Sequence, residues 1–253
     1  VALPQVVLVG KAETEAEARV LLATFDRQGY QARSLLLVCP GEVAGLLKSD
    51  RGDIHFLDLK EAGSKTLLEL LPRGVRVCGI CAGDFYGSHY VEDLVIATTY
   101  SEARVIGKGR RFSLKNGSEL VVDEGSEYQW VDRLPIRSAM LPLEDCGSVS
   151  AMAWLASLPD AIVQGKGLLA TDRFNYCFEG AKLSVQDAER VSGALSLIRP
   201  GIGFEQLESF ACRIGPEKRP TQDIPFWSGA DLAARFRLPE TKPFSGKLTG
   251  AIW

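Results

Sequence analysis

The sequence has no excess of charge of either sign. Its 29 lysine and arginine residues nearly balance 32 aspartate and glutamate residues, which leaves a formal net charge of -3. A general role on nucleic acids or membrane surfaces would require a basic patch or stripe. The balance therefore argues against nucleic acid and membrane partners.

Long apolar runs and a secretory leader are also lacking. No apolar run approaches the roughly 18 residues that span a bilayer. The first residues, VALPQVVLVG, have neither a basic flank nor the long apolar core of a secretory signal. We therefore expect a cytoplasmic protein, although processing of a precursor would leave the same sequence.

Cysteine is present but follows no regular spacing. The six residues are Cys39, Cys78, Cys81, Cys146, Cys177 and Cys212. Scattered thiols of this kind are typical of reduced cysteines in a reducing compartment. Cys78 and Cys81 form a CxxC, which occurs in redox pairs and in half of a zinc site, but no second CxxC or paired histidine completes a metal set. We expect structural thiols and no metal.

The rest of the composition is that of a globular protein. The chain has 253 residues, of which 46% are apolar, so it can bury a sizeable core. In its first part, strands predicted at 5–10, 34–39 and 54–59 alternate with helices predicted at 13–27 and 65–71. This alternation predicts an α/β fold with a largely parallel or mixed central sheet flanked by helices.

The second part of the chain is less regular. Residues 107–133 are polar and rich in turns, and Asn116-Gly117 between SLK and SELVV indicates a hairpin. A helix at 149–158, a strand at 167–170 and helices at 181–197 and 204–214 are predicted after it. From 215 onward prolines interrupt any long helix. We expect an α/β domain over 1–214 and a proline-rich arm over 215–253 that packs on the domain or on a partner.

Residues 72–99, PRGVRVCGICAGDFYGSHYVEDLVIATT, carry the strongest functional signal. The apolar runs 75–77 and 94–97 are predicted strands, and Gly79, Ala82 and Gly83 have little or no side chain where the first run ends. A ligand can approach the main chain there, because ligands of α/β sheets bind at the carboxyl ends of strands. An ordinary glycine turn is the alternative.

Three segments resemble, in the same order, the nucleoside phosphorylase and nucleosidase superfamily: VVLVGKAETEAEARVLL at 6–22, GICAG with EDLVIATT within 79–99, and GLLATDRFN at 167–175. The chain is most similar to the methylthioadenosine/S-adenosylhomocysteine nucleosidases, over about 5–214. The resemblance implies a nucleoside phosphorylase-like fold and a purine-type nucleoside N-ribosyl hydrolase. It also implies a small-molecule nucleoside ligand, no cofactor, and a homo-oligomer or a subunit of a complex.

The resemblance also implies roles for single residues. Glu15 takes the position of the family's water-activating glutamate, with Glu13 and Glu17 as competitors, although a helix N-terminus alone favours such acids. Glu208, within QLESFA and beside Leu207, would hold ribose, unless it is an acid that faces solvent. The remaining implied contacts are Phe174 on the base with Asn175 beside it, Gly79, Ala82 and Gly83 on the sugar side, and Asp172 in a structural hydrogen bond.

Two departures from the family pattern leave alternatives open. Val77 and Cys78, not an arginine, precede Gly79, which favours hydrolysis over phosphorolysis. The family's final S-D pair is missing after Glu208, so Asp223 or Asp231 would have to serve the leaving base. A catalytically decayed nucleoside-binding or subunit-interaction protein is therefore the alternative function. A flavodoxin-like domain whose GICAG turn binds an anion is a third hypothesis.

Overall fold

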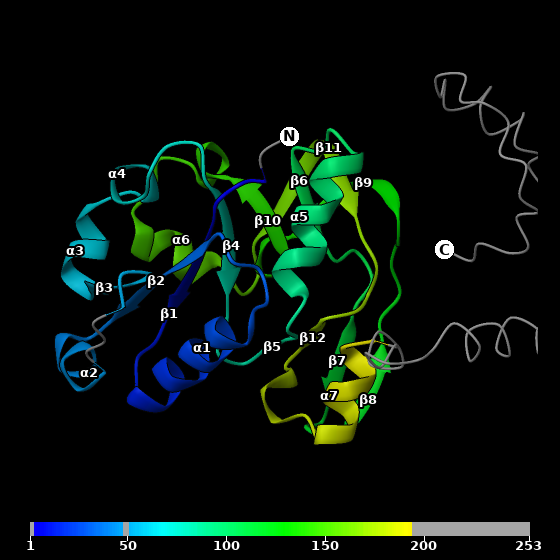
Figure 1. The fold of residues 1–253 in the computed structure, drawn as a ribbon, viewed down its shortest axis with the longest axis horizontal. Helices are drawn as coiled ribbons and strands as arrows, with labels where there is room; N and C mark the ends of the chain where they lie inside the picture. The colour runs from blue at the N-terminus through cyan, green and yellow to red at the C-terminus, as the bar shows by residue number, and fades with distance from the viewer. Residues whose placement is uncertain (1–2, 48–50, 194–253) are drawn as a thin grey trace, which may run out of the picture. The chain divides into compact units, whose positions relative to one another are not determined.

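A large mixed sheet forms the centre of the fold. The computed structural model describes residues 3–47 and 51–193 (Figure 1). The sheet order is β3-β2-β1-β4-β10-β6-β11-β9. Its first four strands are parallel: β3 (Ile54–Asp58), β2 (Arg33–Cys39), β1 (Val6–Lys11) and β4 (Arg76–Ile80). The α/β class with a mixed central sheet is thus confirmed.

The other half of the sheet reverses direction. β10 (Ala139–Pro142) is antiparallel to both β4 and β6 (Val105–Gly107). β11 (Ile162–Ala170) is parallel to β6, and β9 (Gln129–Pro135) pairs antiparallel with β11 at the edge. Because β10 is antiparallel to both of its neighbours, β4 and β6 run in the same direction.

Side chains of the parallel strands alternate between two cores. Val6 and Leu8 belong to one buried cluster, and Val7 and Val9 belong to the other. The first cluster includes side chains of α1 (Glu15–Arg27), α2 (Gly41–Leu46) and α5 (Tyr90–Tyr100). The second includes side chains of α3 (Leu59–Ser64), α4 (Leu67–Leu70) and α6 (Ala151–Ser157). Helices therefore cover both faces of the sheet.

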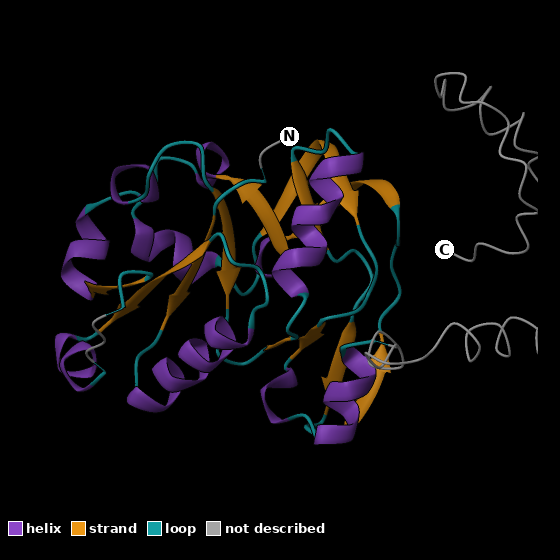
Figure 2. Cartoon of the chain, viewed as in Figure 1, coloured by secondary structure: helices purple, strands orange, loops and turns teal. Residues whose placement is uncertain are grey.

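A second sheet of four short strands packs with α7 (Val185–Val191), at the lower right of Figure 2. Its strands, in order, are β5 (Phe85–Tyr86), β12 (Tyr176–Phe178), β7 (Phe112–Lys115) and β8 (Glu119–Val122). β7 and β8 pair antiparallel around Asn116 and Gly117, which both have positive φ. The predicted Asn-Gly hairpin is thus confirmed. Three short 3-10 turns complete the described elements: η1 (Ile136–Ser138), η2 (Leu143–Cys146) and η3 (Gly180–Lys182).

The strand predicted at 94–97 is wrong, because these residues lie within helix α5. The buried side chains of the helix include Tyr90, Val91, Leu94 and Val95, a spacing of one helical turn. Glu92 and Asp93 occupy its first turn, where carboxylates interact well with the helix dipole. The apolar run therefore continues a helical stripe that begins at Tyr90, not a strand.

Predictions for the C-terminal part lie largely outside the described residues. The helix predicted at 181–197 corresponds to α7 over the part that is described. The helix at 204–214 and the arm over 215–253 lie beyond residue 193, so the boundary between the two expected domains stays a prediction.

Candidate functional site

The carboxyl ends of β1 and β4 lie side by side. The two strands are parallel, and Gly10 pairs with Ile80 at their ends. β1 leads into the turn before α1, and β4 leads into the hinge Cys81–Gly83. A cavity of about 290 Å³ opens here, and we call it the β1–β4 cavity. Its lining residues are Lys11, Glu13, Glu17, Ile80, Cys81, Ala82, Gly83, Leu155, Ala156, Leu158 and Pro159.

One cation and two carboxylates lie at the α1 side of this cavity. Lys11 Nζ is 2.8 Å from Glu13 Oε1, and this hydrogen bond and ion pair lower the pKa of Glu13. Glu17 Oε2 accepts hydrogen bonds from the backbone N–H groups of Glu13 and Thr14. In return, Thr14 Oγ1 accepts from the N–H of Glu17, which forms a capping box. Glu17 thus holds the turn, while Lys11 and Glu13 face a largely solvated opening.

The hinge is held by a tyrosine hydroxyl. Tyr86 Oη accepts a hydrogen bond of 3.0 Å from Cys81 N–H and donates one of 3.0 Å to the Arg137 carbonyl. Asp84 N–H donates to the Cys81 carbonyl, which closes the turn over Ala82 and Gly83. These hydrogen bonds therefore fix the main chain of the hinge. Because Ala82 has a small side chain and Gly83 has none, a ligand can approach the main chain there.

A buried ion pair lies directly behind the hinge. Asp84 has a fully buried carboxylate that accepts from Arg137 Nε at 2.8 Å and Nη2 at 2.6 Å. It also accepts from Tyr176 Oη and from the backbone N–H of Glu179. Burial alone would lower the pKa of Arg137, but the Asp84 carboxylate raises it above its ordinary value. The guanidinium therefore stays charged, and its Nη1 donates to the carbonyl of Pro159 in the cavity wall.

The CxxC thiols are poorly ionised. Burial raises the pKa of Cys81 to about 12 and raises the pKa of Cys78 further. At neutral pH both side chains are thus thiols, the less reactive form. Over 3–47 and 51–193, no group of three or more His, Cys, Asp and Glu side chains is arranged to hold a metal ion.

The predicted site residues fall in different places. Gly83 and Ala82 line the β1–β4 cavity together with Glu13 and Glu17, the two competitors of Glu15. Glu15 itself is not among the lining residues; it forms an exposed ion pair with Arg19 on α1. Gly79 is buried in β4, where a Cβ atom would lie 2.4 Å from Leu158 Cδ1. The hinge and the start of α1 therefore both line the cavity, but with Glu13 and Glu17 in place of Glu15, and without Gly79.

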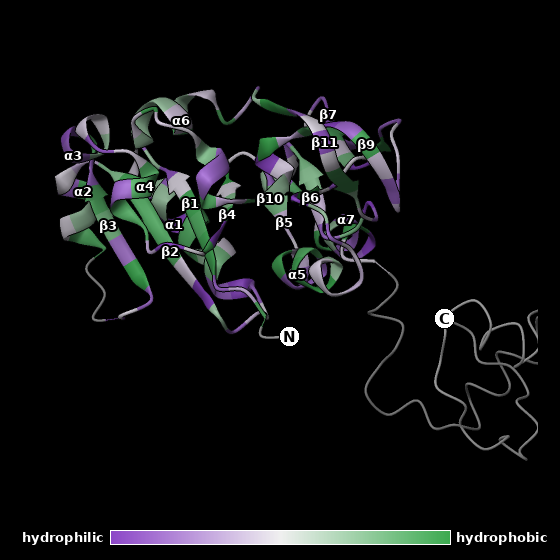
Figure 3. Cartoon of the chain, turned by 90° about the horizontal axis from the view of Figure 1, so that it is seen from above, coloured by the Kyte–Doolittle hydropathy of each residue, from purple (hydrophilic) through white to green (hydrophobic). Residues whose placement is uncertain are grey.

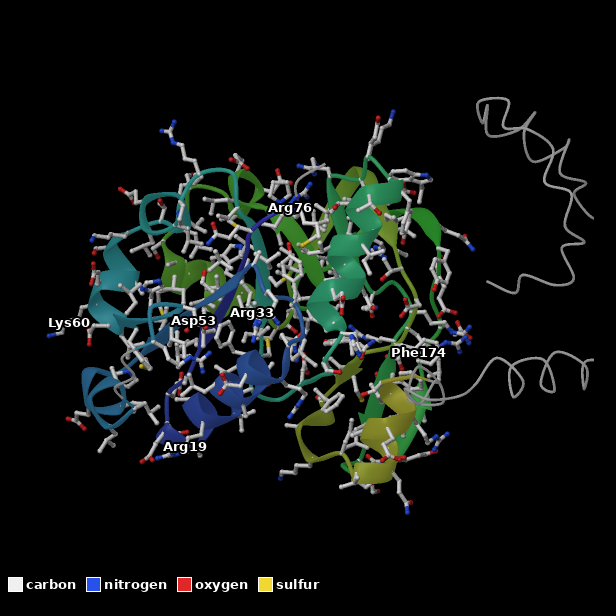
Figure 4. All side chains as sticks on the ribbon, viewed as in Figure 1. Arg19, Arg33, Asp53, Lys60, Arg76 and Phe174 are labelled. Atoms are coloured by element: carbon white, nitrogen blue, oxygen red, sulfur yellow. The ribbon has the colours of Figure 1, made fainter. Side chains whose placement is uncertain are left out.

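Phe174, Asn175 and Asp172 are not part of this cavity. The Phe174 ring packs on Phe112 with centroids 6.0 Å apart, in the core beside the second sheet (Figure 4). Asn175 is buried and donates through Nδ2 to Asp93 Oδ2, and Asp172 Oδ1 accepts from Phe174 N–H. The predicted structural hydrogen bond of Asp172 is confirmed. Leu207, Glu208, Asp223 and Asp231 lie outside the described residues.

Sequence reasoning missed the groups that hold the site. Lys11 carries a local signal, because it ends the first strand at the edge where ligands bind. Asp84 also carries one, since it is the first charged residue after the glycine hinge. Arg137 and Tyr86 have no such signal, because their contacts join residues that are far apart in the sequence.

Comparison with known proteins adds little to the geometry. No protein-family model matches this chain, and no curated protein matches it. A crystal structure of S. aureus TarS 1-349 matches with a TM-score of 0.44 and 9% identity, over 82% of this chain and 78% of that chain. The same protein in complex with UDP-GlcNAc matches with a TM-score of 0.44 and 8% identity, over 74% and 64%. A likeness at this level carries no argument about function.

The resemblance to the nucleosidases is wrong. The two solved structures above are of TarS, and none of the comparisons supports a nucleosidase. The EDLVIATT segment, which the resemblance treats as a strand, is helix α5. Hydrolysis of a purine-type nucleoside, and the alternative of a decayed nucleoside-binding scaffold on that fold, therefore lose their basis.

Among the described residues, no helix is long and apolar enough to cross a membrane.

Proposed function

We propose that the chain binds a nucleotide sugar in the β1–β4 cavity and uses it as a glycosyl donor. One observation carries this proposal. Lys11, the exposed carboxylate of Glu13 and the hinge Cys81–Gly83, which has no bulky side chain, lie together at the carboxyl ends of two adjacent parallel strands. Ligands of open α/β sheets bind at this edge, where the strand order changes direction. Here the order reverses between β1 and β4, because β2 and β3 lie on one side of β1 and β4 lies on the other.

Each group of the cavity has a matching part in such a ligand. The Lys11 ammonium is a compact charge suited to a phosphate. Its partner Glu13 is exposed, and exposed ion pairs are worth only about 0–1 kcal/mol, so a diphosphate can compete for the lysine. Once released, the Glu13 carboxylate can accept hydrogen bonds from sugar hydroxyls. A nucleotide sugar supplies both groups within a few bonds of each other.

The cavity size limits what it holds. Ligand sites commonly measure about 300–1,000 Å³, and this cavity, at about 290 Å³, is at the small end. We therefore assign to it the diphosphate and the adjoining sugar ring. The hinge is already held by Tyr86 and by the Asp84–Arg137 pair, so little ordering is needed when the ligand binds.

The test is calorimetry with UDP-GlcNAc, UDP and N-acetylglucosamine. UDP-GlcNAc is the first probe because it contains the diphosphate and the adjoining sugar ring that we assign to the cavity, and UDP and N-acetylglucosamine test these parts separately. We expect Lys11→Met to weaken binding of UDP-GlcNAc and UDP by tenfold or more, since one charge-assisted contact is worth about 1.5–3 kcal/mol. The matched control is Lys60→Met, because Lys60 is an exposed lysine on α3 that does not line the cavity, and its side chain points outward at the left of Figure 4. No binding of any nucleotide sugar, or equal binding by Lys11→Met, would refute the proposal.

Cytoplasmic location and self-association belong to the same proposal. The described cysteines, Cys39, Cys78, Cys81, Cys146 and Cys177, are free thiols, as a reducing compartment would keep them. Light scattering of the purified chain tests the expected homo-oligomer.

A further inference from the structure

A second cavity lies beside β9, and we call it the β9 cavity. It measures about 600 Å³, twice the size of the first. Its walls are Lys108 and Gly109 after β6, the loop 123–126, and residues 130–135 of β9. Ile162, at the start of β11, closes one side. No residue expected from the sequence to bind a ligand lies in it.

Both cavities open at the same edge of the large sheet. β4 and β6 run in the same direction, so Lys108 follows the carboxyl end of β6 as Cys81 follows that of β4. Only β10 separates the two strands in the sheet. Neighbouring strands lie about 4.8 Å apart, so the two strand ends are separated by about 10 Å.

Two short segments form the wall between the cavities. Pro135 lines the β9 cavity, and two residues later Arg137 Nη1 donates to Pro159 O, which lines the β1–β4 cavity. On the other segment, Ile162 of the β9 cavity follows Pro159 by three residues. The Ile136 N–H donates to the Ala161 carbonyl and joins the two segments. Ligands bound in the two cavities would thus be separated only by these two segments.

The side chains of the β9 cavity suit a saccharide. The Trp130 indole is 59% exposed, and an open aromatic face stacks on the apolar face of a pyranose ring. The side chains of Asp132 and Arg133 form no hydrogen bond or ion pair within 3–47 and 51–193, so an acceptor and donors are available for hydroxyls. Lys108 is not available, because its buried ammonium pairs with Asp93 at 3.2 Å and Asp172 at 3.0 Å.

We infer that the β9 cavity binds a hydroxyl-bearing saccharide, with Trp130 under its ring, and that this saccharide is the acceptor of the glycosyl group. The acceptor role rests on the proposed function. In the transfer, an acceptor hydroxyl oxygen forms a bond to the anomeric carbon of the donor sugar, and the bond from that carbon to the diphosphate oxygen breaks. The nucleoside diphosphate leaves with the electron pair, and the hydroxyl proton passes to water.

The binding test uses saturation-transfer NMR and calorimetry with methyl glycosides of glucose, galactose and N-acetylglucosamine and with their β-linked disaccharides. We expect at least one probe to bind, Trp130→Ala to weaken its binding by tenfold or more, and Trp130→Phe to retain part of it. The control is Tyr100→Ala, because Tyr100 is also 59% exposed but does not line the cavity. Circular dichroism checks that each variant is folded.

The outcomes separate this inference from the proposed function. Saccharide binding that depends on Trp130 but not on Lys11, with UDP-GlcNAc binding that depends on Lys11 but not on Trp130, supports both. Absence of saccharide binding, or equal binding by Trp130→Ala and the parent, overturns the saccharide site even if UDP-GlcNAc binds. Failure of nucleotide sugars to bind, with saccharide binding intact, overturns the proposed function and the acceptor role but leaves the saccharide site.

Discussion

The two halves of the large sheet share their apolar cores but differ in buried charge. Strands of both halves place side chains in the same two cores, and the strands of the parallel half, β3-β2-β1-β4, contain no buried charged residue (Figure 3). The mixed half, β10-β6-β11-β9, contains buried charge: the Lys108 side chain is fully buried, and Arg137 is 8% exposed. Apolar burial stabilises without fixed geometry, whereas each buried charge requires a partner in place. The mixed half therefore depends on a few specific pairs.

The seam between the halves lies behind the hinge. Asp84 follows β4 of the parallel half, and Arg137 precedes β10 of the mixed half. Tyr86 and Tyr176 add hydroxyl contacts to the same place, and their rings lie 5.4 Å apart. The strands of the parallel half thus form one edge of the β1–β4 cavity. The contacts of Asp84, Arg137, Tyr86 and Tyr176, which we call the seam, set the position of the hinge at that edge.

The largest effect is expected from breaking the seam. Asp84→Asn removes the charge that pairs with buried Arg137, and loss of one partner from a buried pair costs about 3–5 kcal/mol in the free energy of unfolding. Urea denaturation monitored by circular dichroism measures it. The control is Glu15→Gln, which breaks the exposed pair with Arg19 and is expected to change stability by less than about 0.5 kcal/mol. Equal effects of the two substitutions would show that the halves do not differ as described.

A middle-sized effect is expected within the parallel half. A Cβ at Gly79 would lie 2.4 Å from Leu158 Cδ1 and 3.0 Å from the Trp154 ring, so Gly79→Ala overpacks the contact between β4 and α6. We expect a loss of about 1–3 kcal/mol, measured as a lower urea midpoint. Gly83→Ala is the matched control, because no atom lies within 4 Å of its Cβ position. A Gly79→Ala protein as stable as the parent would mean that α6 can shift at little cost in free energy. The packing of the parallel half would then be less tight than proposed.

The smallest effect is a pH dependence in the mixed half. Burial raises the pKa of Asp93 above 3.8, and the nearby Lys108 only partly opposes this. A carboxyl group whose pKa is higher in the folded than in the unfolded state contributes stability below pH 3.8, and this contribution is lost as pH rises through the folded-state value. Asp93→Asn should remove this slope, an effect of about 1.4 kcal/mol per unit of pKa difference.

Thermal melts of the parent and Asp93→Asn between pH 3 and 7 measure the difference. The stability of the parent relative to the variant should fall as pH rises over the lower part of this range. A constant difference would show that Asp93 has the same pKa in both states, and the buried charge of the mixed half would then carry no pH signature.

Local pattern determined much of the parallel half. The strands β1, β2 and β3 and the helix that begins after Thr14 follow from the period of apolar residues, and in the second sheet the hairpin follows from the Asn116-Gly117 pair. Each of these depends on residues within one or two turns of each other. The meeting of the hinge with the acidic start of α1 does not follow from local pattern, because it requires β1 and β4 to be neighbours in the sheet.

Tertiary structure alone decided the rest. Glu13, not Glu15, lines the cavity, and this depends on where the hinge after β4 and the residues 155–159 lie relative to the start of α1. The run Leu94–Ala97 is helical because its buried stripe begins at Tyr90 and packs on the large sheet. Asp84 and Arg137 are 53 residues apart, and Lys108 and Asp172 are 64 apart. Such contacts form only when the strand order is established, and the spacing of neighbouring residues does not encode that order.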